Sequence, residues 1–528
     1  MNKSLSKFKT IASLIVFISA ILENIFFFGL QDFYASIVLI YGWVLIKSVV
    51  LTSGNLKLYP VSFLMVLGLS IFHFVLPMPL TLLEFKPVTY NLRVPFLTFS
   101  HQFLFVTIIV FTHFIYTKLS NGKNIFRSVL NETNFYVQPT DKIIWITALL
   151  GLFASFYNYF IFDAWQKEAA DRNFLYYINS IMSQFIWMPM IIPFSKFRGI
   201  EPGVNKKNIR NIFIYSIFVF VVAIASNWRT VLFSGILILF GMFFIGFLLQ
   251  YYNLKKIINP RKIVLIFGVI LFITGPLIDL GYSMVIVRHD RGTLSTVDFL
   301  SKTISTFNDK DLLDKAKAIG SNKDGVSFIQ SMAWDENYLH NIVANRFVNL
   351  KISDNSLFYA EAIGFKNQAM QDELVNQVVA FTPNLILNFF DFDVSKKVES
   401  SKYSIGDFLY SLAINDSNVR GSAVVSSMPG VGMAIFGYWY LAILVPIFLV
   451  IFSMFDSFVK VRNNRIVFSY FFFLMLVSIL NYFNDRHVYT YEFKFIIRTY
   501  AESILLFLMV MKIIKFSSSL SINKRNYT

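Results

Sequence analysis

The sequence predicts an all-α polytopic membrane protein with about twelve transmembrane helices and a large helical external loop. Of its 528 residues, 56% are hydrophobic and only 15% are charged, and the mean hydropathy is +0.59, which is too apolar for a water-soluble core. The apolar runs approach the roughly 20 residues that cross a bilayer as a helix, and the alternating ten-residue segments of a transmembrane barrel are missing. The spans are therefore expected to be helical.

The apolar runs predict where the spans begin and end. The first apolar run has lysines before it but no small-residue cleavage site, which favours a retained span over a signal peptide. The predicted spans are 10–29, 33–51, 59–77, 96–117, 142–162, 174–194, 211–226, 230–250, 263–287, 431–456, 466–483 and 494–513.

Lysine and arginine in the loops predict the orientation, because they favour the cytoplasmic side. With the N-terminus inside, the cytoplasmic stretches hold 25 of the 47 basic residues, and both termini are cytoplasmic. Three parts follow: spans one to nine (1–287), an external loop domain (288–430) and spans ten to twelve with a cytoplasmic tail (431–528). Since the net charge of +16 is explained by topology, nucleic acid binding is not indicated.

The loop 288–430 is long enough to have structure of its own. Helical spacing of apolar residues predicts three helices, in 309–320, 336–352 and 360–381, the last ending near Pro383. The chain has no cysteine, so no disulfide holds this external part together.

Arginines gather on the predicted outer side, where positive charge is disfavoured. Guanidinium groups there suit a lipid-linked pyrophosphate, and a neighbouring histidine or aspartate would accept the proton of an attacking hydroxyl. The candidate catalytic residues are Arg229, Arg288, His289, Asp290 and Arg291, and the candidate substrate-binding residues are Arg346, Arg420, Asp485, Arg486, His487 and Arg498.

Structural roles compete with these assignments. Arg288 and Arg291 would also anchor a helix end among lipid headgroups, and Asp290 would also form a salt bridge. Arg498 with Glu502 fits an internal ion pair. Four buried-span residues, Glu23, His73, His101 and His113, are interpreted as hydrogen-bonded contacts between helices. Asp391 and Asp393 form a short DxD pattern that is frequent by chance, so neither metal nor cofactor is expected.

The layout resembles the Wzy-type polymerases of O-antigen and other repeat-unit polysaccharides, within the group that also contains the O-antigen ligases. The similar features are the spans with inside termini, the late external loop, the turn "SNWRTVL", the opening "RHDRG", and "SSMPGVGMAIFGYWYLA" with Gly430, Gly432 and Gly437 before re-entry.

This resemblance implies a metal-independent glycosyltransferase in the bacterial inner membrane, with the loop in the periplasm or outside the cell. It would act on undecaprenyl-pyrophosphate-linked oligosaccharides for O-antigen (lipopolysaccharide) or capsule, together with a flippase and a chain-length regulator. Arg229, Arg288 and Arg291 would stabilise the departing pyrophosphate, with His289 or Asp290 as the base.

Three other functions remain open. In a non-catalytic sensor or assembly protein, the arginines would be incidental anchors. A ligase would share the layout and the lipid donor. A polysaccharide flippase would also have about twelve spans and buried arginines, but transporters usually contain two related halves with short loops. The long late loop favours the enzyme.

Overall fold

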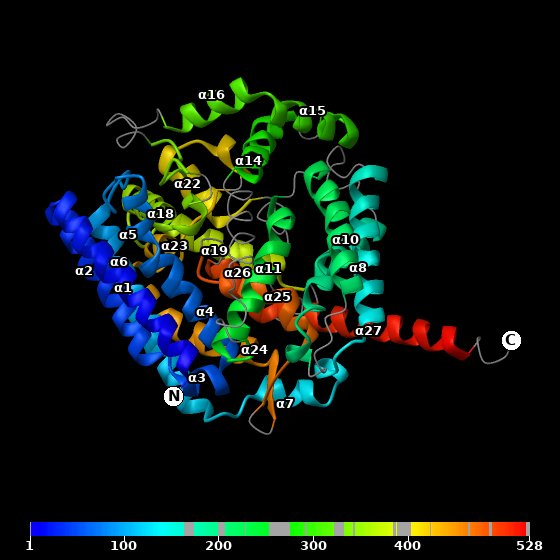
Figure 1. Cartoon of the computed structure of the whole chain (residues 1–528). Helices are drawn as coiled ribbons and strands as arrows, with labels where there is room; N and C mark the ends of the chain where they lie inside the picture. Colours follow the sequence, from blue (N-terminus) through cyan, green and yellow to red (C-terminus); the bar gives the residue numbers. More distant parts are fainter. Residues whose placement is uncertain are drawn as a thin grey trace.

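The structure is a computed structural model, and it shows a bundle of helices with shorter helices gathered at one end (Figure 1). It describes residues 2–162, 174–198, 206–226, 229–252, 275–290, 293–321, 332–341, 344–383, 387, 403–422, 424–462, 465–484 and 488–523.

The elements up to residue 250 are α1 (Lys3–Phe26), α2 (Leu30–Val49), α3 (Ser53–Leu58), α4 (Pro60–Ser70), the π-helix η1 (Ile71–Val75), α5 (Pro77–Leu83), α6 (Pro95–Ser120), α7 (Ile125–Asn131), η2 (Asn134–Tyr136), α8 (Asp141–Phe156), the π-helix η3 (Tyr157–Ile161), α9 (Phe174–Met182), η5 (Ser183–Phe185), η6 (Met188–Ile191), η7 (Ser195–Arg198), α10 (Lys206–Ala225) and α11 (Arg229–Leu248).

The later elements are α14 (Pro276–Ile286), η8 (Val287–Asp290), α15 (Thr296–Asn308), α16 (Lys310–Ser321), η9 (Ala344–Phe347), α18 (Leu350–Ile363), α19 (Gln368–Phe381), α22 (Ile405–Ile414), η10 (Ser417–Val419), α23 (Met428–Phe436), η11 (Gly437–Trp439), α24 (Tyr440–Asp456), β1 (Val459–Arg462), β2 (Arg465–Phe468), α25 (Tyr470–Leu480), α26 (Tyr489–Lys494), the π-helix η12 (Phe495–Thr499) and α27 (Tyr500–Asn523).

Among the described residues, 8 helices are long and apolar enough to cross a membrane, and each overlaps a predicted span. They are Lys3–Phe26, Leu30–Val49, Pro60–Leu83, Pro95–Ser120, Asp141–Ile161, Lys207–Ala225, Val231–Leu248 and Met428–Asp456. These many apolar helices support the prediction of a membrane protein. The number twelve is not confirmed.

The four other predicted spans differ from long helices in separate ways. A continuous helix over 174–194 is wrong, because α9 ends at Met182 and short 3₁₀ turns follow; Pro189 and Pro193 lack the amide hydrogen that a continuing helix needs. The span 466–483 is helical only in α25, since the antiparallel hairpin β1–β2 takes its first residues. Of 263–287, the structure describes the part from residue 275.

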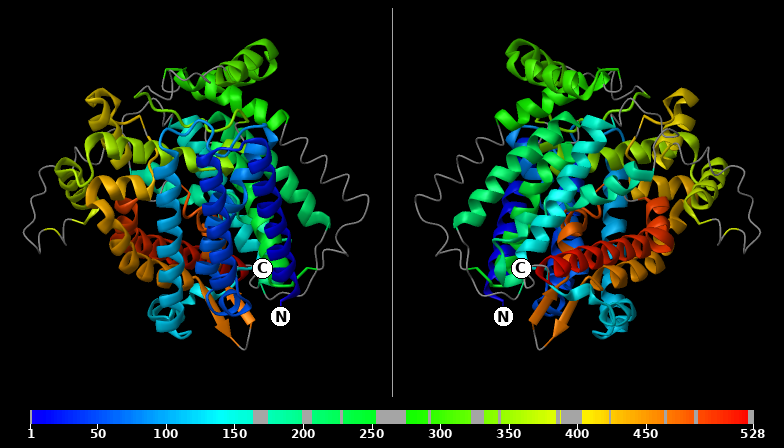
Figure 2. Two further views of the ribbon diagram at one scale, coloured as in Figure 1. Left: turned by 90° about the vertical axis from the view of Figure 1, so that its left-hand side faces the viewer. Right: turned by 90° about the vertical axis from the view of Figure 1, so that its right-hand side faces the viewer.

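The last predicted span, 494–513, lies within the run from α26 to α27. Figures 1 and 2 show that α27 crosses the bundle at a steep angle to α1 and α2. It is therefore oriented unlike the long upright helices.

The two ends of the bundle carry different elements (Figure 1). The N-terminus, α3, α7 and the β-hairpin lie at one end, and α14, α15, α16, α18 and α22 lie at the other.

Within the segment 288–430, the helix predicted over 309–320 is confirmed as α16. The helix predicted over 360–381 is confirmed only from Gln368, as α19, because α18 ends at Ile363 and Gly364 has a φ of +84°; α19 ends just before Pro383. The helix predicted over 336–352 is wrong, because α18 begins only at Leu350. Side chains bind the preceding backbone instead: Glu84 accepts hydrogen bonds from the amides of His340 and Asn341. Such bonds offer the backbone an alternative to a helix.

Helix α18 is polar in sequence but buried in the molecule. Its run Ser353–Ser356 is at most 5% exposed, and the helix packs against α6, α22 and α23. A Cβ atom at Gly430 of α23 would lie 2.3 Å from Cβ of Ser356, so only glycine allows the two helices to approach this closely. The segment 288–430 therefore penetrates the bundle as well as covering it.

Candidate functional site

Arg288 is the second residue of η8, which directly follows α14, and its side chain is exposed. It makes no hydrogen bond or ion pair with any described residue. Asp290, two residues later, forms an ion pair with Lys302 of α15 at 2.9 Å, which is the structural role weighed for it from the sequence, although the partner is a lysine. Within the described part of the chain, Arg288 thus has no polar partner, whereas Asp290 has one.

The other predicted catalytic residues are described only in part. Arg229 is the first residue of α11 and His289 belongs to η8, but their side chains lie outside the described part, as does all of Arg291. The nearby packing is informative: Leu232 of α11 shares a buried apolar cluster with Leu277 and Met284 of α14. The first turn of α11 and the helix that leads to Arg288 are therefore neighbours.

Of the predicted substrate-binding arginines, Arg346 lies exposed in η9 and makes no hydrogen bond or ion pair with a described residue. Arg420 stacks over the rings of Phe408 and Tyr403, at 4.9 and 5.5 Å, and donates to Ser411. The described contacts of Arg420 are thus all internal.

Arg498 pairs with Glu502 at 2.7 Å, as the alternative interpretation expected, and also donates to the carbonyl of Phe381. Asp485, Arg486 and His487 lie outside the described residues, as do Asp391 and Asp393. In the part of the chain that the structure describes, no cluster of three histidine, aspartate or glutamate side chains could hold a metal.

Of the four buried-span residues interpreted as interhelical contacts, the three histidines make hydrogen bonds to another helix: His101 bonds the hydroxyl of Tyr440, and His113 bonds that of Ser62. Glu23 differs, because it accepts from the amide of Val88 in the connection between α5 and α6. The fourth, His73, bonds Gln102 and the carbonyl of Phe483.

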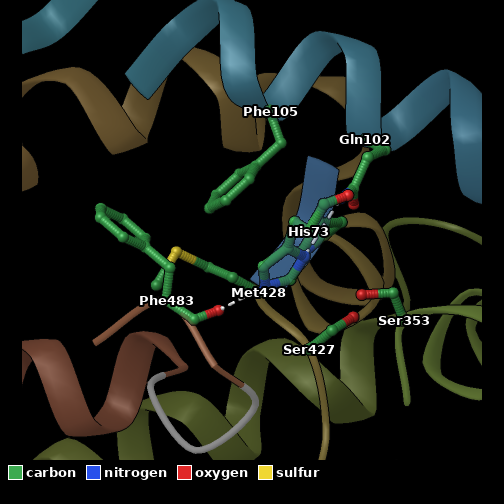
Figure 3. A pocket seen from close by; sticks show the side chains of 8 residues that line it. His73, Gln102, Phe105, Ser353, Ser427, Met428 and Phe483 are labelled. Carbon is green, nitrogen blue, oxygen red and sulfur yellow. Dashed lines mark hydrogen bonds between the residues drawn. The ribbon is translucent and has the colours of Figure 1, made fainter. Parts of the chain in front are cut away.

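His73 also lines a small cavity where the segment 288–430 meets the bundle (Figure 3). The cavity has a volume of about 20 Å³, enough for one or two water-sized particles. Its walls come from η1, α6, α18, the start of α23 and the turn that follows α25. The lining residues are His73, Gln102, Phe105, Ser353, Ser427, Met428, Pro429 and Phe483. A π-helical turn such as η1 is frequent at functional sites.

The hydrogen bonds of His73 define the protonation of its ring. The Phe483 carbonyl can only accept, so Nε2 carries a hydrogen and donates at 3.2 Å. The amide nitrogen of Gln102 can only donate, so Nδ1 accepts at 3.1 Å. Both ring nitrogens are used, and His73 therefore acts here as a fixed structural link and not as a free base.

A buried carboxylate holds α18 in place beside this cavity. Asp354 accepts hydrogen bonds from the backbone amides of Arg93 and Val94, 2.8 to 2.9 Å away, and from the hydroxyl of Thr98 at 3.2 Å. These groups are at the N-terminus of α6, where unpaired amides and the helix dipole favour a negative charge.

Two cations complete this contact. Lys351 reaches Asp354 at 3.4 Å and also donates to the Asn91 carbonyl; burial lowers the pKa of Lys351, while the charge of Asp354 opposes that shift. Arg93 donates to Tyr359 and lies 4.8 Å over the ring of Phe358. We call Asp354, Lys351 and Arg93 the docking cluster.

Sequence reasoning did not find the docking cluster or the cavity. The one available signal was in the sequence of α18, where the polar run "SDNS" interrupts an apolar pattern. No protein-family model, curated protein or solved structure matches this chain.

Proposed function

We propose that this protein is a metal-independent membrane glycosyltransferase that polymerises lipid-linked oligosaccharide repeat units. The growing chain would leave its undecaprenyl pyrophosphate and pass to a new lipid-linked unit, for an O-antigen or capsular polysaccharide. The proposal places the protein in the bacterial inner membrane, with both termini in the cytoplasm and the segment 288–430 in the periplasm or outside the cell.

The main support is the exposure of two arginines at the end of the bundle that carries α14, α15 and α16. Arg288 and Arg346 are exposed and make no hydrogen bond or ion pair with described residues, whereas Arg127 and Arg198 elsewhere bind carbonyls or a carboxylate of their own protein. A guanidinium left without an internal partner can bind phosphate oxygens in pairs. It would stabilise the charge that develops on a departing pyrophosphate.

The test is deletion of the gene followed by gel analysis of the surface polysaccharide. A polymerase defect leaves a single repeat unit and removes the long-chain ladder. Full-length polymer that accumulates on its lipid carrier would instead indicate the ligase. Repeat units trapped on the cytoplasmic face would indicate the flippase.

Complementation with point variants connects the activity to the residues. Arg288→Ala, and Arg346→Ala separately, are expected to lower polymer by about 10²-fold at unchanged protein level, as loss of one charge-stabilising donor usually does. The matched control is Lys315→Ala, another exposed cation of the same segment. Normal polymer from both arginine variants would contradict the proposal.

Orientation can be measured directly, because the chain contains no cysteine. Ser305→Cys in α15 should react with a membrane-impermeant maleimide on intact cells, whereas Lys123→Cys should react only after lysis. The reverse pattern would refute the proposed topology.

A further inference from the structure

The cavity described above lies at the start of a broken helix. The apolar run Met428–Asp456 contains two helices, α23 and α24, separated at Gly437, whose φ of +57° is a conformation that favours glycine. The break leaves α23 as a half-helix whose first residues, Met428 and Pro429, form one wall of the cavity. Half-helices of this kind direct the positive end of their dipole into the protein interior.

The polar groups at this end are mostly hydrogen-bond donors. Ser427 caps α23 by accepting from the Gly430 amide, which leaves its own hydroxyl hydrogen without an acceptor among the described residues. The Met428 amide likewise has no described partner, and Pro429 has no amide hydrogen. The N-terminus of α23 therefore has donors without a described partner next to the cavity.

Ser353 provides an independent indication of a ligand. The residue is 5% exposed, and its hydroxyl makes no hydrogen bond with any described residue. Figure 3 shows its hydroxyl directed toward Ser427 at the cavity. This hydroxyl therefore faces the cavity as a donor that a group inside it can satisfy.

The walls also limit what this group can be. None of the eight lining residues is acidic, and the carboxylate of Asp354, the neighbour of Ser353, is directed to the start of α6. Of the acceptors in the lining, Nδ1 of His73 and the Phe483 carbonyl are already bonded, and the side-chain oxygen of Gln102 accepts no hydrogen bond from a described residue. A volume of about 20 Å³ favours a ligand close in size to one or two water molecules over a phosphate or a sugar.

We propose that this cavity is a binding site for a single monatomic anion of the halide class. The anion accepts hydrogen bonds from Ser353 and Ser427 and interacts with the dipole of α23. Because these groups come from α18 and α23, the bound anion joins the segment 288–430 to the bundle. This site is independent of the proposed glycosyl transfer.

The experiment is a thermal-melting titration of the purified full chain with chloride, replacing gluconate at constant ionic strength. The expected result is a saturable rise of about 2 °C, since a ligand that binds only the folded state stabilises it. Ser353→Ala should remove the rise. Ser70→Ala is the control that should keep it, because this serine is buried in the same bundle but bonds the Leu67 carbonyl.

The other outcomes count against the site. The absence of a saturable chloride effect in the unmodified protein overturns the proposal even if Ser353→Ala fails to fold. An equal rise in the Ser353→Ala variant places the anion elsewhere, and a larger rise with phosphate or sulfate excludes a monatomic ligand. A density map of protein kept in bromide gives a direct check, and an ordered water at Ser353 with no bromide would also overturn the proposal.

Discussion

Two parts of the segment 288–430 have similar polar sequences but opposite environments. Helices α15 and α16 lie over the end of the bundle with most of their polar side chains exposed. Helix α18 is buried between α6, α22 and α23, although it contains four consecutive polar residues. The difference shows that burial here depends on whether the bundle offers hydrogen-bond partners and not on hydrophobicity alone.

The largest expected effect is loss of the carboxylate that holds α18. Asp354→Ala removes the acceptor for the first amides of α6 and leaves Lys351 as a buried charge, so we expect a destabilisation of about 3–5 kcal/mol. The readout is the melting temperature together with protease cleavage within 288–430. The control is Asp298→Ala, an exposed carboxylate in the first turn of α15, and equal effects of the two variants would contradict the comparison.

Crowding between α18 and α23 should give the next largest effect. Gly430→Ala places a methyl group 2.3 Å from Cβ of Ser356, and overpacking of this kind costs about 1–3 kcal/mol. Gly281→Ala in α14 is matched to it, because no atom lies within 4 Å of the added carbon. The melting temperature should fall for Gly430→Ala only; a tolerated Gly430→Ala would mean that the two helices are not in close contact.

A pH titration tests the buried side of α19, which packs against α22, α23 and α26. Burial raises the pKa of Glu373 in α19, whose carboxylate accepts from Tyr403. Because the raised pKa means that the folded state holds the proton more tightly, this contribution to stability is present at acid pH and is lost as pH rises above about 4.5.

The measurement is the difference in melting temperature between the unmodified protein and Glu373→Gln across this range. We expect Glu373→Gln to gain relative stability as pH rises. Glu361→Gln, at an exposed position of α18, should show a constant difference. A constant difference for both variants would mean that the folded environment of Glu373 does not favour its protonated form.

The smallest effect is expected at the exposed pair of Asp290 with Lys302. Its side chains are 31% and 49% exposed, and a surface pair contributes only about 0.2–1 kcal/mol. Asp290→Asn should therefore leave the melting temperature within about 2 °C, even if polymer formation is lost. A large drop in melting temperature would show that the α14–α15 connection is as tightly held as α18.

The sequence allowed prediction of the elements that depend on local patterns. Apolar length identified the eight long spans, and helical periodicity identified α16 and α19. The position of α18 could not be predicted in this way, because the partners of Asp354 are about 260 residues away and the bond from Ser427 to Ser356 spans 71. The same limit applies to the arginines. The sequence around Arg420, which stacks on an aromatic ring, does not differ in pattern from the sequence around Arg346, which is exposed.

The burial of α18 has a consequence for the order in which the protein is made. Its contacts with α6 are available early in synthesis, but its largest contact surface is α23, which leaves the ribosome some 70 residues after α18. The Asp354 carboxylate and the polar run around it can be buried completely only after α23 has been made. Packing of α18 into the bundle is therefore a late step that follows insertion of the early spans. Chains truncated before residue 428 should therefore expose α18 to proteases even when α1 to α11 are already in the membrane.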